Sequence, residues 1–370
     1  MTNATRKDER IRSTNVLEKI MARPELGSVF GLITILIAFI LLTSSSGTFQ
    51  AMFLSPTGIQ GWVELAAFVG ILAIAAALLM IAGEFDLSMG ANIAFSGHTF
   101  ALMVMNGVPI PLAVGITFFL LALLGLLMGT IVVRTGLPSF IVTLGFWFAS
   151  RGFAVFLGQA LEKQSRLSVR DFVRPPRGSD AADPTWIDNI FAFTQGFFGL
   201  EAIPALSWLS VLRFDAEVYY FIIIVIITSL ILLRTKYGNW IFAAGGDPVA
   251  ARAVGVPVAR VKISLFIFST CMAGLLGIVT VLSSGASDPK AGDFRELHAI
   301  AAAVIGGCAL TGGYGSVIGA VFGAFIFAIA SQGIIYVPFF DNNLFRVILG
   351  TLILLAALLN QLLRNRVLKG

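Results

Sequence analysis

The chain has 370 residues, of which 57% are hydrophobic and 12% are charged, and its formal net charge is +5. Soluble proteins average about 25% charged residues, so the composition excludes a soluble enzyme or binding domain. The basic residues flank apolar runs, as they do in membrane proteins, so the positive charge does not indicate a nucleic-acid partner.

Apolar runs of about 20 residues, each long enough to cross a bilayer as a helix, recur along the chain. They lack the period-two alternation of a transmembrane β-barrel. The sequence therefore predicts an all-α polytopic membrane protein with about ten transmembrane helices. The predicted spans lie near residues 26–45, 62–82, 86–105, 109–133, 138–157, 218–233, 263–284, 297–310, 316–333 and 344–363. The third and eighth are polar or short, so we expect them to be broken or re-entrant.

Clustered arginine and lysine residues predict the orientation, because they favour the cytoplasmic side of a membrane protein. An even number of spans places all of these clusters on one side: Arg6, Lys7, Arg10, Arg12, Lys19, Arg23, Arg134, Arg234, Lys236, Arg252, Arg260, Lys262, Arg364, Arg366 and Lys369. Both termini are therefore predicted to be cytoplasmic.

This topology divides the chain into a cytoplasmic N-terminal segment, residues 1–25, and a membrane domain, residues 26–370. The first span is interpreted as a retained helix and not as a cleaved signal peptide. Residues 158–217 form a long external loop, which is either a lid with a short surface helix or a docking face for an external partner. Residues 234–262 form a cytoplasmic segment.

The third predicted span opens with two acids, Glu84 and Asp86. Asp86 lies where a helix N-cap is expected, and direct contact with a solute is the alternative. Four polar residues then share one helix face by their spacing: Ser88, Asn92, Ser96 and Thr99. This stripe either lines a solute pathway or forms hydrogen bonds between helices.

Arg151 lies inside the fifth predicted span. A charge at that depth is expected to face protein or water, so we predict that it pairs with an acid or a backbone carbonyl, and a role in transport is the alternative. His98 and His298 lack metal-ligand spacing and are predicted to be hydrogen-bonded interior residues. The dipeptide Gly-Lys never occurs, so the chain has no Walker A phosphate loop, and we predict no metal or cofactor site.

A short helix with both ends encoded in the sequence is predicted at residues 247–254. The Asp247 carboxylate can cap its first N–H groups, and Pro248 suits the first helical position. Gly255 can adopt the left-handed conformation that closes a helix, and Pro257 prevents its continuation. Such a rigid helix in a loop is either the seat of a partner protein or a passive connector.

Small residues at four-residue spacing predict close helix packing. They occur as Gly125 and Gly129, and again as Gly315, Gly319 and Gly323. The segments that begin at Gly83 and Gly312 both follow an apolar run and open a small-residue helix, so the sequence predicts two weakly related halves.

Several ordered motifs together resemble one family. Residues 83–90 read Gly-Glu-Phe-Asp-Leu-Ser-Met-Gly and resemble the G-x-x-D-L-S-x-G signature of ribose/xylose-type ABC sugar importer permeases, the inner-membrane components of binding-protein-dependent transport systems. Residues 138–145 with Arg151 and Gly152, residues 235–256 and residues 296–316 resemble further signatures of the same family. The resemblance extends from about residue 62 to residue 363.

The resemblance implies a multi-pass permease of the bacterial inner membrane that forms a homodimer among the membrane lipids. Cytoplasmic ATP-binding cassette subunits would hydrolyse ATP, so this chain would not itself be an enzyme, and a periplasmic sugar-binding protein would deliver a monosaccharide or related polyol. It also implies contact with the ATPase at Gly246, Asp247, Ala250, Ala251, Arg252 and Gly255. The family motif residues are Asp86, Gly90, Arg151, Gly312, Gly313 and Gly315.

Two other classes of protein remain as alternatives. A self-sufficient secondary transporter would usually carry ionisable residues in several spans, whereas Arg151 is the clear example here. An intramembrane enzyme would need a polar catalytic cluster, which the sequence does not indicate. Co-purification of an ATPase would separate the importer subunit from both alternatives.

Overall fold

The computed structural model describes residues 24–173, 214–337, 347, 350, 351 and 354 of the chain. Its elements are α2 (Pro24–Ser46), the π-helical turn η1 (Gln50–Leu54), α3 (Pro56–Ile81), α4 (Met89–Met105), α5 (Ile110–Thr135), α6 (Ser139–Glu162), β1 (Leu167–Ser168), α7 (Arg170–Val173), α9 (Ala216–Arg234), α10 (Lys236–Gly246), α11 (Pro248–Ala253), α12 (Val258–Ser284), β2 (Ala286–Ser287), α13 (Arg295–Ile305) and α14 (Val317–Ile335).

The prediction of an all-α polytopic membrane protein is confirmed. Within the described residues, seven helices are long and apolar enough to cross a bilayer: α2, α3, α5, α6, α9, α12 and α14. The third and eighth predicted spans correspond to α4, with 17 residues, and α13, with 11 residues. At about 1.5 Å per residue, both are shorter than the roughly 30 Å hydrocarbon core.

The predicted total of about ten spans is not confirmed. Residues 344–363, the predicted last span, lie almost wholly outside the described residues. The basic residues of 1–23 and 364–369 and most of the external loop, residues 174–213, also lie outside them.

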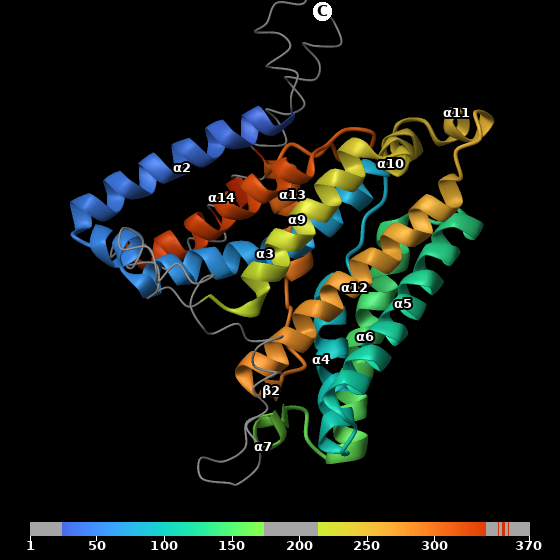
Figure 1. Ribbon diagram of the computed structural model, residues 1–370, viewed down its shortest axis with the longest axis horizontal. Helices are drawn as coiled ribbons and strands as arrows, with labels where there is room; N and C mark the ends of the chain where they lie inside the picture. The colour runs from blue at the N-terminus through green and yellow to red at the C-terminus, as the bar shows by residue number, and fades with distance from the viewer. Residues whose placement is uncertain (1–23, 174–213, 338–346, 348–349, 352–353, 355–370) are drawn as a thin grey trace, which may run out of the picture.

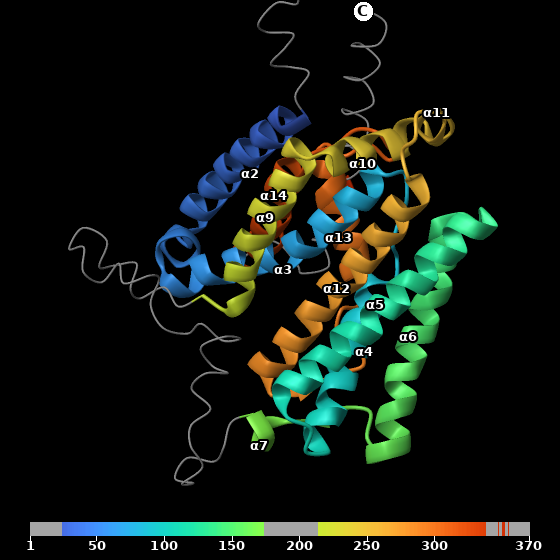
Figure 2. The same ribbon diagram turned by 45° about the vertical axis from the view of Figure 1, so that its right-hand side comes forward.

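Helix α3 forms the centre of the molecule (Figure 1). In its most apolar 18-residue window, 83% of the residues are buried, against 17% in α2 and 22% in α6. Helices α9, α13 and α14 pack around α3, whereas α4 and α5 pack against α12. Helix α12 contacts α3 as well and joins the two groups of helices (Figure 2).

Glycines bring the helix backbones together at both predicted sets of small residues with four-residue spacing. An added Cβ at Gly125 of α5 would lie 2.7 Å from Ile267 Cα of α12. One at Gly319 of α14 would lie 2.0 Å from the Gly306 carbonyl oxygen at the end of α13. Real Cβ atoms do not approach other atoms this closely. The predicted role of these glycines in close helix packing is therefore confirmed.

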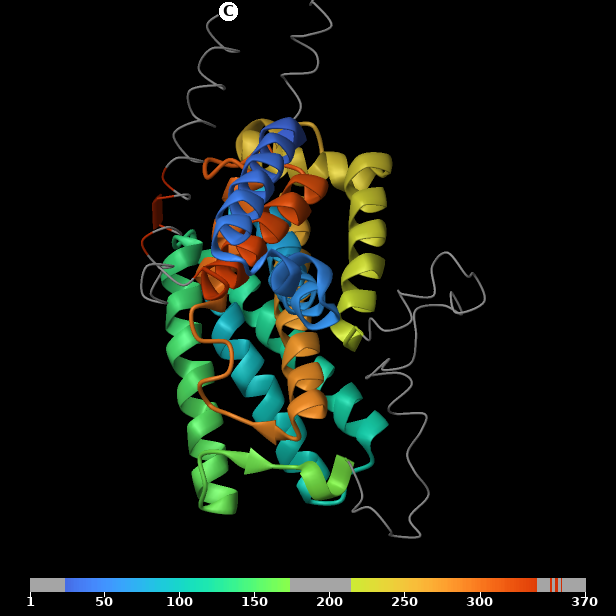
Figure 3. The same cartoon turned by 90° about the vertical axis from the view of Figure 1, so that its left-hand side faces the viewer.

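A small antiparallel ribbon, which the sequence did not predict, lies at the end of the molecule opposite α11 (Figures 1 and 3). Leu167 pairs with Ser287 and Ser168 with Ala286. The ribbon forms because Gly285, at φ 70°, ends α12 in a left-handed conformation and turns the chain toward β1. The start of the long loop is thereby fixed to the end of α12.

Candidate functional site

The predicted capped helix exists as α11 and has the expected ends. Asp247 Oδ1 accepts hydrogen bonds from the N–H groups of Val249 at 2.9 Å and Ala250 at 3.0 Å, and Pro248 occupies the first turn. Gly255 has φ 86°. The Val256 N–H donates to the Ala251 carbonyl at 3.0 Å, which completes a Schellman closure. Both local predictions are confirmed.

The surface of α11 divides into an anchored side and an exposed side. Ala251, one of the residues predicted to contact the ATPase, is buried in the main apolar core. It therefore anchors α11 to the rest of the membrane domain. Val249 and Val254 are 72% and 81% exposed, and Arg252 is exposed beside them. Sequence reasoning did not select these two valines. Exposed apolar residues around a basic group are a surface that a partner protein can bury.

Two irregular segments interrupt the helices: residues 82–88, between α3 and α4, and residues 306–316, between α13 and α14. We call them the first and the second break. Helix α10, which precedes α11, contacts both. An added Cβ at Gly245 would lie 1.8 Å from the Ile81 carbonyl oxygen, and one at Gly312 would lie 2.6 Å from the Gly245 carbonyl oxygen. The Gly313 N–H donates to the Ile81 carbonyl at 2.8 Å. Gly312 and Gly313 have φ values of 81° and 73°, which favour glycine. We call Gly83, Gly245, Gly246, Gly312 and Gly313 the glycine junction.

The two breaks begin with the same backbone geometry. Gly83, with φ 81°, follows α3, and Gly307, with φ 93°, follows α13. In each, the next residue donates to the carbonyl five positions back, at 2.9 Å for Glu84 and 3.0 Å for Cys308. This closure is the Schellman pattern that ends many helices. Gly107 closes α4 in the same way, so the relation between the halves stays a prediction.

Side chains from α6 and α12 hold the first break, residues 82–88. The N–H groups of Phe85 and Leu87 donate to Ser139 Oγ and Thr143 Oγ1, both at 3.0 Å. The ammonium of Lys262 forms an ion pair with the Glu84 carboxylate, and the two side chains are 14% and 11% exposed. Since α12 begins at Val258, shortly after α11, this pair connects α11 to the break.

A buried polar chain continues from the break into the membrane domain. Asp86 accepts hydrogen bonds from Ser269 Oγ at 2.6 Å and from Ser88 Oγ at 2.6 Å. Asn92 Nδ2 donates to Ser88 Oγ at 2.9 Å, and Ser150 Oγ donates to Asn92 Oδ1 at 2.9 Å. These hydrogen bonds connect α12, α4 and α6. A buried network whose polar groups are all hydrogen-bonded specifies one arrangement of helices.

The structure corrects the prediction that Asp86 is the N-cap. Helix α4 begins at Met89 with Ser88 as its N-cap, and Asp86 instead accepts the N–H of Ser88 at 2.8 Å. The other oxygen of its carboxylate accepts a hydrogen bond from Ser269 of α12.

The polar stripe on α4 is interior in this conformation. Ser88, Asn92 and Ser96 are fully buried, and Ser96 and Thr99 donate to carbonyls of their own helix at 3.0 and 2.8 Å. Asn92 thus makes a predicted hydrogen bond between helices, with Ser150 of α6, and lining of a pathway stays a prediction. Gly90 allows close approach, since an added Cβ would lie 2.3 Å from the Gly292 carbonyl oxygen.

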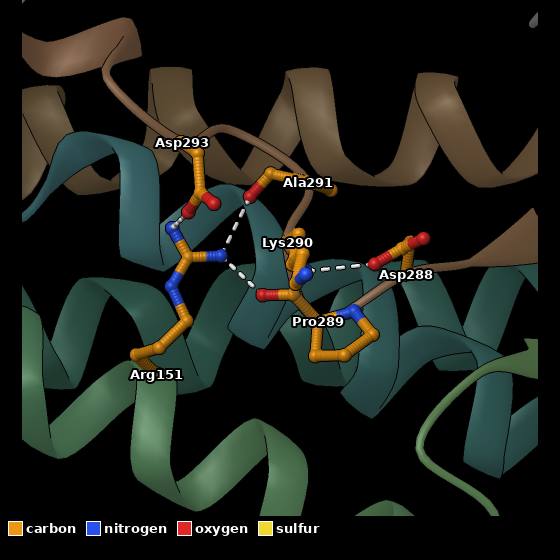
Figure 4. A network of polar contacts seen from close by, with 6 residues as sticks. All are labelled: Arg151, Asp288, Pro289, Lys290, Ala291 and Asp293. Atoms are coloured by element: carbon orange, nitrogen blue, oxygen red, sulfur yellow. Dashed lines mark hydrogen bonds and ion pairs between the residues drawn. The ribbon is translucent and has the colours of Figure 1, made fainter.

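Arg151 of α6 makes the predicted contacts with an acid and with carbonyls (Figure 4). Its guanidinium pairs with Asp293 at 2.6 Å and donates to the carbonyl oxygens of Ala291, at 3.0 Å, and Pro289. These three partners lie on the segment 288–293, which leads from β2 to α13.

The two histidines differ from each other. His98 is buried and hydrogen-bonded, with Nδ1 2.8 Å from Ser287 Oγ and Nε2 2.9 Å from the Ser165 carbonyl, which confirms the prediction. The buried Nδ1 of His298 has no hydrogen-bond partner among the described residues, and its ring packs on Phe327. At Nδ1 the predicted hydrogen bond is therefore absent among the described residues, and the ring makes an aromatic contact instead.

Comparison with known proteins places the chain in a family. Residues 58–357 match the family described as "Branched-chain amino acid transport system / permease component". The chain belongs to this permease family. It is a membrane permease component of ABC transporters, and the match covers the glycine junction, α11 and Arg151.

Curated relatives of the permease are named for sugars. The xylose transport system permease protein XylH of Escherichia coli (strain K12) is 30% identical, with 91% of this chain and 93% of the relative aligned. The fructose import permease protein FrcC of Rhizobium meliloti is 31% identical over 82% and 77% of the two chains. The L-arabinose ABC transporter permease protein AraH of Azospirillum brasilense is 26% identical over 92% and 91%. No solved structure matches the permease significantly.

Sequence reasoning missed most of the groups that hold the permease's first break. Ser139 and Thr143 lie in the quoted 138–145 motif, and Lys262 appeared only as one of the basic residues. Their partners are more than 50 residues away in sequence, so local spacing gives no signal for them. Motif membership was the one available signal, and it pointed to Ser139 and Thr143.

Proposed function

We propose that the permease carries a monosaccharide or related polyol across the bacterial inner membrane as the membrane subunit of an ABC importer. The observation that carries this proposal is the near full-length similarity to permeases named for xylose, fructose and arabinose. The family description names branched-chain amino acids instead. The sugar named for the relatives is the better guide to the substrate, because these relatives align over most of both chains.

In the proposed mechanism, α11 is seated in a cytoplasmic ATP-binding cassette subunit. Three features of α11 support this role: its rigid capped ends, its exposed apolar and basic surface, and its position directly after the glycine junction. A backbone contact without side chains transmits displacement well, because no side chain can rearrange to absorb it. Movement of α11 would therefore reach both breaks through the backbone contacts of Gly245. The Lys262–Glu84 ion pair would give a second route to the first break.

The proposed orientation places α11 in the cytoplasm and the β1–β2 ribbon in the periplasm. Four basic residues on or beside α10 and α11 support it by the positive-inside rule: Arg234, Lys236, Arg252 and Arg260. Both termini would then be cytoplasmic. A periplasmic sugar-binding protein would dock on the ribbon end, and a second copy of the permease would complete a homodimer.

The experiment is solute uptake into proteoliposomes that contain the permease with its ATPase and binding protein. D-xylose, L-arabinose, D-fructose and L-leucine are compared, with ATP inside or outside the vesicles. We expect ATP-dependent uptake of a sugar and none of leucine. Uptake of leucine alone would reject the proposed substrate class. Purification of the permease without an associated ATPase would reject the proposed partner.

A further inference from the structure

A cavity of about 200 Å³ lies between α4, the last turns of α12 and the segment after β2. It is on the ribbon side of the molecule, far from α11. A cavity of about 150 Å³ admits benzene, so this one has room for one six-membered ring with its substituents. It is smaller than the roughly 300–1,000 Å³ of pockets for drug-sized ligands, which limits it to a single small solute.

The lining of the cavity combines an apolar floor with a polar rim. Ile93 and Val281, together with the backbones of Gly97 and Gly277, form the floor. The polar groups come from the end of α12, from β2 and from the residues next to the two strands: Arg166, Thr280, Ser284, Ser287 and Asp288. A sugar ring presents C–H groups on its faces and hydroxyl groups at its edge, and both kinds of surface find a partner here.

Two hydroxyl groups of the rim are already engaged as donors. Thr280 Oγ1 donates to the Leu276 carbonyl at 2.7 Å, and Ser284 Oγ donates to the Thr280 carbonyl at 2.6 Å. The third, Ser287 Oγ, lies 2.8 Å from His98 Nδ1, where either atom can be the donor.

A hydroxyl oxygen that donates its proton keeps lone pairs, so Thr280 and Ser284 can each accept a hydrogen bond from a solute, as can the Asp288 carboxylate. Acceptors spread around a ring-sized cavity require a solute with several separate donors. A pyranose has a hydroxyl at nearly every ring carbon, whereas an amino acid has its donors on one ammonium group. The Arg166 guanidinium adds donors for the oxygen atoms of the same solute, so the rim offers both acceptors and donors to a sugar ring.

Arg151 fixes the loop wall of the cavity from the neighbouring helix (Figure 4). Ala291 and Asp288, both lining residues, lie on the segment whose carbonyls and Asp293 carboxylate bind the Arg151 guanidinium. The Lys290 N–H donates to Asp288 Oδ1 at 2.8 Å, which orients that carboxylate. Arg151 is a positioning residue for this wall.

We propose that this cavity binds one monosaccharide on the periplasmic side of each permease protomer, through the hydroxyl oxygens of Thr280, Ser284 and Ser287 and the carboxylate of Asp288. The proposal rests on the proposed function of the permease as a sugar importer. It assigns to this chain a solute site separate from the glycine junction.

The first test is protection of an introduced thiol in the assembled transporter. Ser284→Cys is compared with Ser283→Cys, a neighbour outside the cavity, after both native cysteines are replaced by alanine. A membrane-impermeant thiol reagent is added with the transported sugar or with L-leucine. At a sugar concentration of ten times Kd, we expect labelling of Ser284→Cys to slow about tenfold, because only unoccupied sites react. The labelling of Ser283→Cys should not change.

The second test is uptake by Asp288→Asn at subsaturating sugar. Loss of a charge-assisted hydrogen bond should lower uptake by about tenfold, whereas Ser283→Ala should match the wild type. Protection by leucine, no protection by sugar, or equal protection at both cysteines would overturn the proposal, as would unchanged uptake by Asp288→Asn. If the wild type transports a sugar but these results fail, the cavity assignment alone is wrong. If the wild type transports none of the sugars, the proposed function is wrong.

Discussion

At the residue scale, a few glycines and one ion pair hold together the end of the permease that carries α11. The glycine junction brings three stretches of backbone together, and a side chain at Gly245, Gly312 or Gly313 would collide with neighbouring backbone. Such contacts resist substitution more than an apolar core does, because backbone atoms cannot adopt another rotamer. The Glu84–Lys262 pair adds a charge contact that is shielded from solvent, where an unpaired partner is costly.

Gly245→Ala is expected to destabilise the permease by about 1–3 kcal/mol, the typical cost of overpacking, because its Cβ would lie 1.8 Å from the Ile81 carbonyl oxygen. Gly145→Ala on α6 is the matched control, since nothing lies within 4 Å of its added Cβ. The thermal midpoint of the purified protein measures the difference. Equal midpoints for the two variants would contradict the close backbone contact.

Glu84→Gln and Lys262→Met are each expected to reduce uptake, since breaking a buried ion pair leaves one charge without its partner, at a cost of about 3–5 kcal/mol. The double exchange Glu84→Lys with Lys262→Glu should recover most of the loss that each of these two reversals causes alone. Uptake and the amount of folded protein are measured together. Additive losses in the double variant would show that the pair does not act as a unit.

At the scale of elements, α11 and the segment 288–293 are short pieces that other parts of the chain hold in place. Helix α11 is fixed by its caps and by buried Ala251, which leaves the opposite side exposed. The segment 288–293 is fixed by Arg151, which reaches two carbonyls and one carboxylate at once. Both connect longer helices. Helix α11 presents its exposed side to solvent, and the segment 288–293 forms one wall of the cavity.

Arg151→Lys is expected to impair sugar uptake about as much as Arg151→Gln, because an ammonium group cannot reproduce the planar fork that binds three partners. The defect should be mainly a higher KM, since Arg151 positions the cavity wall and does not contact α11. KM and kcat for uptake are measured at saturating ATP. Full recovery by lysine would show that only the charge matters.

Arg252→Glu and Val254→Asp are expected to uncouple ATP hydrolysis from uptake, because both change the exposed side of α11 without removing its caps. Lys236→Glu, at the far end of α10, is the control for charge reversal. ATPase activity and uptake are compared in proteoliposomes, and membrane insertion is checked by yield. Normal coupling in both α11 variants would exclude α11 as the seat of the ATPase.

At the scale of the whole molecule, the sequence predicted the features that depend on local pattern. The apolar runs predicted each described helix that can span a membrane, and Asp247, Pro248 and Gly255 predicted α11 with its caps. The β1–β2 ribbon, the Glu84–Lys262 pair and the Ser139 and Thr143 contacts could not be predicted, because they join residues far apart in the chain. Asp86 was misplaced because a partner on α12, Ser269, determines its position.

ATP turnover on a separate subunit is proposed to drive this permease, and one measurement tests that claim most directly. Sugar uptake is recorded in proteoliposomes that contain the permease either alone with an imposed proton or sodium gradient, or assembled with its ATPase and binding protein and supplied with ATP. We predict uptake only in the assembled, ATP-supplied vesicles. Uptake by the permease alone, driven by an ion gradient, would contradict the account.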